Sequence, residues 1–399
     1  MDGPFADPQP SPLRRGYFVR NRWANALFVA VDAVLLLLRR TTRAPSSALQ
    51  REPARILLAN GAHLGDIVLS LSTLAAIKAA YPSASIGLLI GSWSRVVIEG
   101  HPLVNRIHIV DHWRLDRSDR PMASKLLRYW RSRRSALGSL KEARYDLAVD
   151  LYFYVPNSAL LLWQAGIPRR IGYRSAGFGP LYTESLEWRL GRGSIVNYFL
   201  DLVRAALPSV PAAAIRAGAP MLDRGVVRPA SVGRPPYAVL HIGTGGATKE
   251  WPLQRWRALA AALDAKGIRT VLTGTGAAEK AKVAAAVEGL LHASDLCGQL
   301  AWAELVATIR DAQFLIGLDS VAGHIAAAFD VPCIILSNGV QEPALWKPQS
   351  DAATVVRHAV SCFPCYRSRG CEAMACIRRV EPGQIATLVQ GVAQRPLRH

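Results

Sequence analysis

The sequence predicts an α/β protein with two doubly wound domains. Short apolar runs, typical of buried strands, alternate with helical patterns in both halves of the chain. Such alternation favours βα units and a parallel sheet. A proline-rich stretch over residues 208–236 interrupts the pattern, which then begins again. The length of 399 residues is enough for about two or three domains.

The first Rossmann-like domain is expected over residues 51–215. Its strands are predicted at the apolar runs 56–59, 86–90, 107–110 and 147–151. Gly61 and Gly65 follow the first run, and a helical pattern from about Asp66 stops before Pro82. A proline disfavours helical geometry in the residue before it, which explains the stop.

The second Rossmann-like domain is expected over residues 236–385. Its strands are predicted at 237–242, 268–272, 314–316 and 331–336, and its helices at 252–266, from 277, at 301–310 and at 322–329. Pro252 stands at a helix start, where its missing N–H is not needed, and Gly267 is typical of a helix end.

The composition excludes several classes of protein. Hydrophobic residues make up 50% of the chain and charged residues 19%, so the chain is not intrinsically disordered. Six cysteines are too few for a disulfide-dense scaffold. A mean hydropathy of +0.14 is high for a soluble protein but too low for a polytopic membrane protein.

The net charge of +19 favours anionic partners. Residues 112–144 hold ten Arg or Lys against three acids. This segment is interpreted either as a solvated arginine-rich face or as a surface for anionic lipid or a phosphorylated glycan. No nucleic-acid partner is expected, because no helix-turn-helix, zinc-finger or RNP signature accompanies it.

An N-terminal extension over residues 1–50 contains an apolar stretch, 23–38, between arginines. As a helix, this stretch is about 24 Å long, shorter than the ~30 Å hydrocarbon core of a bilayer. We favour an amphipathic helix that lies in the membrane interface. The alternatives are a helix packed on its own domain and a span with Asp32 in lipid. The stretch is not typical of a signal peptide.

A glycine-rich loop over residues 243–249 lies between a predicted strand and a helix. Gly243, Thr244 and Gly245 let backbone N–H groups approach an anion, and Lys249 adds a positive charge. The loop lacks the P-loop pattern, which disfavours Walker-type ATP hydrolysis. A plain βα turn is the alternative.

A second junction follows the predicted strand 314–316. Asp319 and Ser320 either cap the next helix or present polar groups at the carboxyl edge of the sheet, where ligands of such folds bind. His324, further along that helix, is either a buried structural histidine or a ligand contact. The third junction, at the first βα turn, carries His63 and Asp66. Asp66 either caps its helix or acts as a general base, with His63 as the alternative base.

The three junctions, with 166–173 and 272–274, resemble in order and spacing the glycosyltransferase family 9 heptosyltransferases of lipopolysaccharide synthesis. The resemblance covers about residues 54–390. It implies the GT-B fold, in which two Rossmann-like domains face a cleft. It also implies inversion at the anomeric centre with no metal cofactor required for catalysis.

The resemblance assigns roles to the site residues. Asp66 matches the catalytic base, Thr244 and Lys249 match contacts to the donor diphosphate, and Glu279 matches the ribose-binding acid. Asp319 and Ser320 match contacts to the donor sugar and phosphate. Val321 stands where the family usually has a glycine.

We therefore expect an inverting glycosyltransferase that moves a heptose-like sugar from a nucleotide donor, ADP-heptose by resemblance, to a lipopolysaccharide core or related lipid-linked glycan. It is expected in the cytoplasm, peripheral on the inner face of the cytoplasmic membrane and its anionic surface. The alternatives are a non-catalytic two-domain binding protein, which would not need Asp66, and transfer to a protein acceptor.

Four cysteines gather within 15 residues near the C-terminus: Cys362, Cys365, Cys371 and Cys376. Four thiols that begin with a Cys-x2-Cys pair suit a structural zinc or iron site. Reduced thiols without metal and disulfides are the alternatives. Some family 9 members, notably autotransporter heptosyltransferases, carry an iron-holding cysteine cluster near the C-terminus. No catalytic role is expected, because no base neighbours the cluster.

Overall fold

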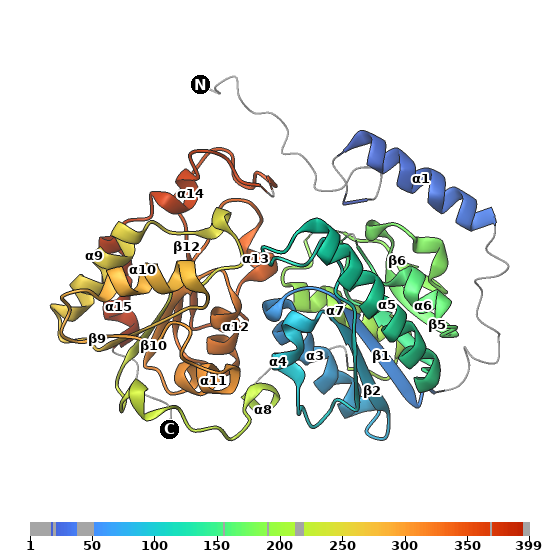
Figure 1. Cartoon of the computed structure of the whole chain (residues 1–399), viewed down its shortest axis with the longest axis horizontal. Helices are drawn as coiled ribbons and strands as arrows, with labels where there is room; N and C mark the ends of the chain where they lie inside the picture. The colour runs from blue at the N-terminus through green and yellow to red at the C-terminus, as the bar shows by residue number, and fades with distance from the viewer. Residues whose placement is uncertain are drawn as a thin grey trace. The chain divides into compact units, whose positions relative to one another are not determined.

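The computed structural model describes residues 17–18, 21–37, 52–154, 156–189, 191–211, 219–367 and 369–393. The described part of the chain falls into two compact units, within 11–217 and 218–399. Each unit is built around one parallel sheet with helices on both faces (Figure 1).

The first unit has a sheet in the order β3-β2-β1-β4-β5-β6, all parallel. Its described strands are β1 (Arg55–Asn60), β2 (Ser85–Ile90), β3 (Arg106–Ile109), β4 (Leu147–Asp150), β5 (Arg169–Tyr173) and β6 (Glu184–Leu186). The buried pattern of β1 and β2 explains their continuous apolar runs, because both faces of a doubly wound sheet are covered.

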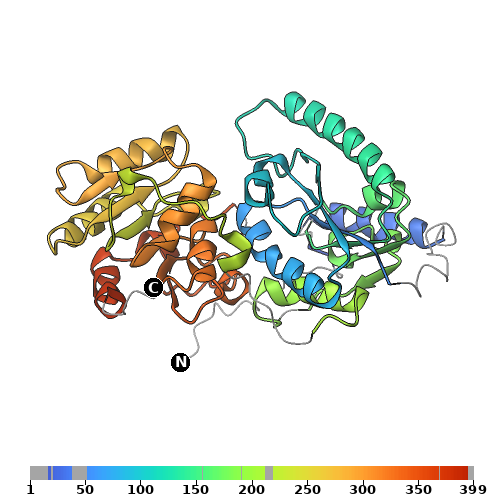
Figure 2. The same cartoon turned by 90° about the horizontal axis from the view of Figure 1, so that it is seen from below.

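The helices of this unit are α1 (Arg22–Leu37), α3 (Leu64–Ala80), α4 (Arg95–Ile98), α5 (Met122–Ala143), α6 (Ala159–Gln164) and α7 (Ile195–Ala206). Short 3-10 turns are η2 (Ser92–Ser94), η3 (Arg174–Ala176) and η4 (Gly179–Leu181). Helix α5 lies on one face of the sheet, and α3 and α7 lie on the other (Figure 2).

The second unit has a sheet in the order β12-β11-β10-β7-β8-β9. Its described strands are β7 (Ala238–His241), β8 (Thr270–Thr273), β9 (Ala293–Asp295), β10 (Phe314–Leu318), β11 (Cys333–Leu336) and β12 (Ala353–Val356). Its helices are α8 (Ala219–Leu222), α9 (Leu253–Asp264), α10 (Ala277–Val287), α11 (Trp302–Arg310), α12 (Val321–Ala328), α13 (Pro343–Trp346), α14 (Ala375–Arg378) and α15 (Pro382–Ala393). Its 3-10 turns are η5 (Ala230–Val232) and η6 (Ala247–Lys249).

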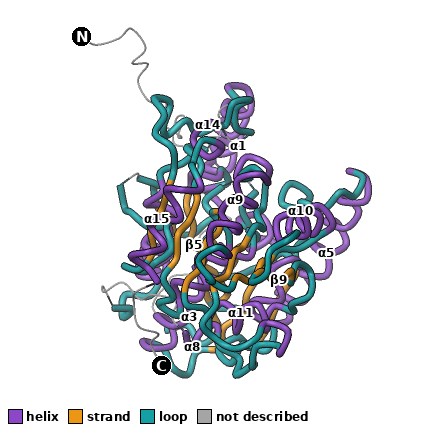
Figure 3. The backbone as a smooth tube through the Cα atoms, turned by 90° about the vertical axis from the view of Figure 1, so that its left-hand side faces the viewer, coloured by secondary structure: helices purple, strands orange, loops and turns teal. Residues whose placement is uncertain are grey.

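The core of the second unit lies mainly between its sheet and the helices α9, α10 and α15. Trp256 on α9 and Phe314 on β10 are completely buried there. Figure 3 shows these three helices in front of the strands. Burial of such aromatic side chains is a large part of what stabilises a domain of this size.

The predicted fold class of two doubly wound α/β domains is confirmed. All eight predicted strands coincide with strands of the structure to within a few residues. Among the described strands, β5, β6, β9 and β12 were not predicted from the sequence. Strand β5 begins with two arginines. Arg170 is nevertheless buried, because its guanidinium donates to the carbonyl oxygens of Leu181 (2.8 Å) and Ile167. Backbone carbonyl oxygens thus accept the hydrogen bonds of a charged side chain that, by residue type alone, is expected on the surface.

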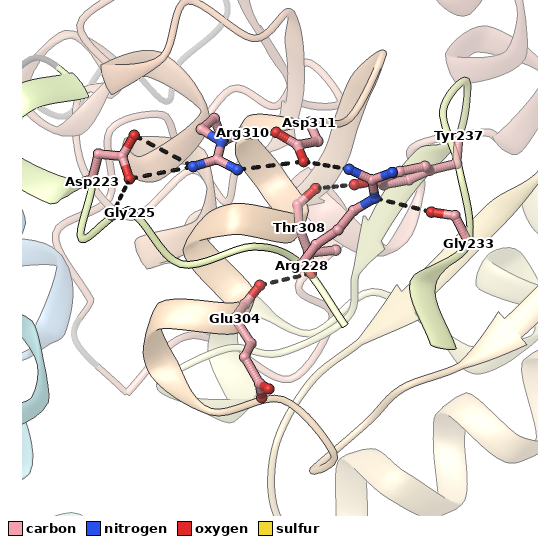
Figure 4. A network of polar contacts seen from close by, with 9 residues as sticks. All are labelled: Asp223, Gly225, Arg228, Gly233, Tyr237, Glu304, Thr308, Arg310 and Asp311. Carbon is pink, nitrogen blue, oxygen red and sulfur yellow. Dashed lines mark hydrogen bonds and ion pairs between the residues drawn. The ribbon is translucent and has the colours of Figure 1, made fainter. Parts of the chain in front are cut away.

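A polar network ties the segment after α8 to the second unit (Figure 4). Arg228 forms an ion pair with Asp311 at 2.6 Å, and Arg310 bridges Asp311 and Asp223. The Nε of Arg228 also donates to the carbonyl oxygen of Gly233 at 3.0 Å. These contacts fix the chain where it enters β7, inside the predicted boundary stretch 208–236.

No helix in the described ranges is both long and apolar enough to cross a membrane. The apolar stretch predicted at 23–38 forms α1, within one residue of the expected bounds.

Asp150, at the end of β4, is a fully buried carboxyl group in the first unit. Its Oδ2 accepts hydrogen bonds from the Ser158 N–H (2.6 Å) and the Tyr182 hydroxyl (2.8 Å). Burial raises the pKa of Asp150 to about 6, although these hydrogen bonds oppose the rise. The carboxyl therefore joins the loop after β4 to the η4 segment, at an electrostatic cost when it ionises.

We expect Asp150 to make the first unit less stable as the pH rises from about 4 to about 6. The folded state holds the Asp150 proton up to about pH 6, whereas the unfolded chain releases it near pH 3.9. The contribution is therefore present below about pH 4 and lost above about pH 6, a change of about 2–3 kcal/mol. Urea unfolding of Asp150→Asn should lack this pH dependence, whereas exposed Asp119→Asn should retain it. Equal pH profiles for both variants would contradict the assignment.

Candidate active site

The candidate residues of the second unit meet at one edge of its sheet. Strands β10, β7 and β8 are parallel neighbours, so the loops at their carboxyl ends lie side by side. These loops carry Thr244 and Lys249 after β7, Thr275 after β8, and Asp319 after β10. The two junctions singled out in this half of the sequence, after β7 and after β10, are thereby brought together with the loop after β8, where parallel-sheet folds bind ligands.

Lys249 and Asp319 form the charged centre of this edge. The Lys249 Nζ donates to Asp319 Oδ2 at 2.7 Å and to the Asp319 carbonyl oxygen at 3.2 Å. Both side chains are partly exposed, at 37% and 22%. An ammonium group has three N–H donors, so one remains for an oxygen of a ligand.

Glu279, at the start of α10, holds the loops after β7 and β8 together. Its Oε1 accepts from the Thr244 N–H at 3.0 Å, and its Oε2 accepts from the Thr275 N–H at 2.7 Å. Gly243 is required beside it, because a Cβ at that position would lie 2.9 Å from Glu279 Oε2 and 2.7 Å from His241 Nε2. Each carboxylate oxygen keeps a second lone pair, so a hydroxyl group can still bind.

Three buried polar atoms at this edge have no hydrogen-bond partner among the described residues. They are Thr244 Oγ1, Ser320 Oγ and His324 Nδ1. Unsatisfied buried polar atoms are costly, and they are expected where a ligand supplies the missing partner. Burial lowers the pKa of His324 to about 4, so the imidazole is neutral at pH 7.

Ser320 is the N-cap residue of α12 and Val321 is its first residue. The unpaired Ser320 hydroxyl therefore lies at the positive end of a helix dipole, a favourable place for an anion. Val321 replaces the glycine that the family pattern has, and the helix nevertheless begins there. Gly245 is exposed in the loop after β7, and no contact of its own assigns it a role.

The sequence reading missed His241, at the end of β7. Its ring is buried, and its Nδ1 lies 2.9 Å from Thr273 Oγ1 at the end of β8. Burial lowers its pKa to about 4. The neutral His241 ring therefore links the ends of β7 and β8, where the loops after these two strands begin. The histidine stands directly before the loop motif, and this position is the only signal that the sequence offered for it.

In the first unit, Asp66 lies in the first turn of α3, after β1. One of its carboxylate oxygens accepts from the His63 N–H at 3.2 Å, so Asp66 does cap its own helix. The His63 ring lies beside Trp93, with ring centroids 6.0 Å apart. Helix capping and a general-base role of Asp66 do not exclude each other, because a capping carboxylate remains able to accept a proton.

Arg117 and Tyr152 are electrostatic neighbours of Asp66 that the sequence reading did not single out. Burial lowers the pKa of Arg117, and the negative charge of Asp66 partly offsets this effect. Burial likewise raises the pKa of Tyr152, and Asp66 raises it further. Arg117 lies after β3 and Tyr152 after β4, so the first unit also gathers polar groups at the carboxyl edge of its sheet.

The family model described as glycosyltransferase family 9 (heptosyltransferase) matches residues 133–374, more than half of the chain. The chain belongs to glycosyltransferase family 9. It is therefore a glycosyltransferase, and the expectation of a non-catalytic binding protein is set aside.

The relative and the solved structure described next align with this family 9 enzyme along almost their whole length. Lipopolysaccharide heptosyltransferase 1 of Pseudomonas aeruginosa is 25% identical over 364 residues, covering 86% of this chain and 99% of the relative. The solved structure of E. coli heptosyltransferase WaaC with ADP matches with a TM-score of 0.67 and 19% identity, covering 85% and 100% of the two chains. The structural match confirms the GT-B fold.

The four clustered cysteines do not form a metal site in the structure. All are free thiols: Cys362 and Cys371 are exposed, Cys365 is intermediate and Cys376 is buried in the core. Within the described ranges, no three His, Cys, Asp or Glu side chains lie together as metal ligands. An iron-containing glycosyltransferase, TibC of enterotoxigenic E. coli, matches with a TM-score of 0.52 and 12% identity, covering 86% of this chain and 76% of that chain.

We expect Glu279→Gln to destabilise the second unit by about 1–3 kcal/mol. The amide NH2 of a glutamine would face either the Thr244 N–H or the Thr275 N–H and leave it without an acceptor. Denaturant unfolding of the whole chain measures the change. The matched control is Glu288→Gln, because the Glu288 side chain is 74% exposed in the same unit. Equal stability of the two variants would show that Glu279 does not hold the loops.

Proposed function

We propose that this family 9 enzyme transfers a heptose, or a similar sugar, from ADP-heptose to a lipopolysaccharide core or related lipid-linked glycan. The observation that carries the proposal is the edge of the second sheet, where Lys249 and two unpaired buried hydroxyls lie beside a helix N-terminus. That arrangement is typical of a site for a diphosphate. The names of the relatives support heptose as the sugar and lipopolysaccharide as the acceptor class.

We assign the donor contacts from the groups present. Thr244, Ser320 and the N–H groups of the loop after β7 donate to the diphosphate. Lys249 turns its remaining N–H to a phosphate oxygen, while Asp319 accepts hydroxyls of the donor sugar. Glu279 accepts the ribose hydroxyls, and neutral His324 supplies its unpaired Nδ1 to the same region. Gly243 and Gly245 let the loop backbone approach the anion.

We assign Asp66 as the general base. It takes the proton of the acceptor hydroxyl as that oxygen forms a bond to C1 of the donor sugar. The bond from C1 to the diphosphate oxygen breaks on the opposite face, and its electron pair leaves with ADP. The configuration at C1 is therefore inverted. His63, the alternative base, lies against Trp93 and fixes the start of α3.

Negative charge grows on the diphosphate in this transition state, and positive charge grows on the sugar ring. Lys249, Ser320 and the dipole of α12 are preorganised to stabilise the leaving diphosphate. No step in this scheme requires a metal. The basic segment 112–144 and the net charge of +19 suit an anionic glycolipid acceptor. We place the enzyme in the cytoplasm, on the inner face of the cytoplasmic membrane.

Donor binding and chemistry should separate in two variants. Isothermal titration with ADP should show binding that Lys249→Ala weakens about tenfold to a hundredfold, because a charge-assisted hydrogen bond is lost. Asp66→Asn should bind ADP within about twofold of the wild type, yet release ADP from ADP-heptose, with a lipopolysaccharide-core acceptor, roughly 10²–10⁴ times more slowly.

The matched controls are Lys266→Ala and Glu52→Gln, which change exposed residues of the respective units. Both should behave as the wild type. Failure of the folded wild-type protein to bind ADP would overturn the donor assignment. Normal transfer by Asp66→Asn would leave the donor site intact and remove Asp66 as the base.

A zinc or iron at Cys362, Cys365, Cys371 and Cys376 would be structural. Cys376 packs in the core of the second unit, where its Sγ would lie 3.5 Å from a Cβ at Gly339. Because the thiols do not converge, we expect far less than one equivalent of metal by elemental analysis of protein purified without chelators. A stoichiometric metal that a quadruple Cys→Ser variant loses would show instead that the four thiols rearrange around it.

A further inference from the structure

Helix α1 is amphipathic in the inverse sense: its polar side chains face the protein and its apolar side chains face outward. Asn25 and Asp32, seven residues apart on one face, are 2% and 7% exposed. Large apolar side chains on the opposite side are exposed: Trp23 (75%), Leu27 (64%), Val34 (55%) and Leu37 (85%). Trp23, Leu27, Val34 and Leu37 follow helical spacing and form one stripe, which we call the outer stripe.

Specific contacts hold α1 in this orientation. Asp32 accepts the Phe178 N–H on Oδ1 at 2.8 Å and the Tyr17 hydroxyl on Oδ2 at 2.9 Å. Phe28 packs edge-on against Phe178, and a Cβ at Gly177 would lie only 2.5 Å from its ring. These contacts hold the polar face of α1 against the first unit and leave the outer stripe exposed.

The outer stripe gathers four exposed apolar side chains on one helix. Leu35 of α1 packs inward, on a small cluster that contains Ala159 of α6. Exposed apolar side chains that share one face of a helix are typical of an interaction surface rather than of a solvated one.

The charge around the stripe identifies the partner. Between residues 13 and 43 the sequence has seven arginines and one acid, and that acid is the inward-facing Asp32. The arginines are Arg14, Arg15, Arg20, Arg22, Arg39, Arg40 and Arg43. A second copy of this segment would carry the same excess of positive charge, which disfavours self-association. An anionic phospholipid surface instead offers negative headgroups to the arginines and acyl chains to the stripe.

We propose that the outer stripe of α1 inserts into the interface of an acidic phospholipid bilayer. Arg22, whose guanidinium lies over the Trp23 ring at 5.3 Å, sits at headgroup level. The helix lies in the plane of the membrane and docks the first unit on the surface. This proposal deepens the membrane location proposed above by assigning it to specific residues.

Flotation of the full-length protein with phosphatidylglycerol-containing vesicles tests the proposal. The wild type should float with these vesicles and far less with pure phosphatidylcholine. Leu27→Glu/Val34→Glu should lower the apparent affinity by at least about tenfold, because it puts carboxylates among anionic lipids. The matched control is Val227→Glu/Leu291→Glu, because these residues are 77% and 87% exposed on the second unit. The control should float as the wild type does.

Equal flotation of Leu27→Glu/Val34→Glu and the wild type would overturn the proposal. A wild-type dimer by light scattering that the same substitutions dissociate, with no flotation, would assign the stripe to a second copy instead. Titration of the wild type and of both double-Glu variants with ADP tests the donor assignment independently of flotation. Loss of flotation with normal ADP binding supports the lipid assignment, whereas absent ADP binding in every protein would overturn only the donor assignment.

Discussion

The proposed donor site in the second unit depends on one carboxylate that two backbone N–H groups bind. Glu279 reaches from α10 to the loops after β7 and β8 and accepts a hydrogen bond from each. The loops contain too many glycines to hold one conformation unaided, since glycine loses more conformational freedom on folding than any other residue. A single charge-assisted bridge therefore orders both. The absence of a Cβ at Gly243 is what lets the carboxylate approach.

The pairing of Lys249 with Asp319 limits the net charge at this edge of the sheet. A lone lysine here would attract any phosphate, and a lone aspartate would repel the donor. Held at 2.7 Å, the pair is neutral overall, so in the proposed donor site the diphosphate is bound mainly by oriented N–H and O–H groups. Such groups need little reorganisation when negative charge moves onto the diphosphate, which is the condition for stabilising a transition state rather than a bound substrate.

The sequence predicted those parts of the fold and the site that short-range pattern determines. The strands that precede the three junctions are apolar runs, so their ends, and with them Asp66, Lys249 and Asp319, could be placed. Strand β5 and helix α5 escaped because their arginines mask the periodicity, and Arg170 is buried only because distant carbonyl oxygens receive it. Arg117 and Tyr152 join Asp66 through strand order, which no local pattern encodes. The spacing of the four cysteines suggested that their thiols meet at a metal site, but in the described part of the chain they do not.

The orientation of helix α1, and not its composition alone, determines which of its side chains are exposed. From the sequence, Asp32 counted against a membrane span, because a carboxylate in lipid is costly. In the structure the same residue orients the helix. Its hydrogen bonds to Tyr17 and Phe178 are satisfied only when the polar face of α1 turns inward, and this rotation leaves Trp23, Leu27 and Val34 exposed. In the membrane proposal, the buried acid thus decides which face of α1 meets the bilayer. The carboxylate that would keep α1 from entering lipid completely is the one that would orient it on the lipid surface.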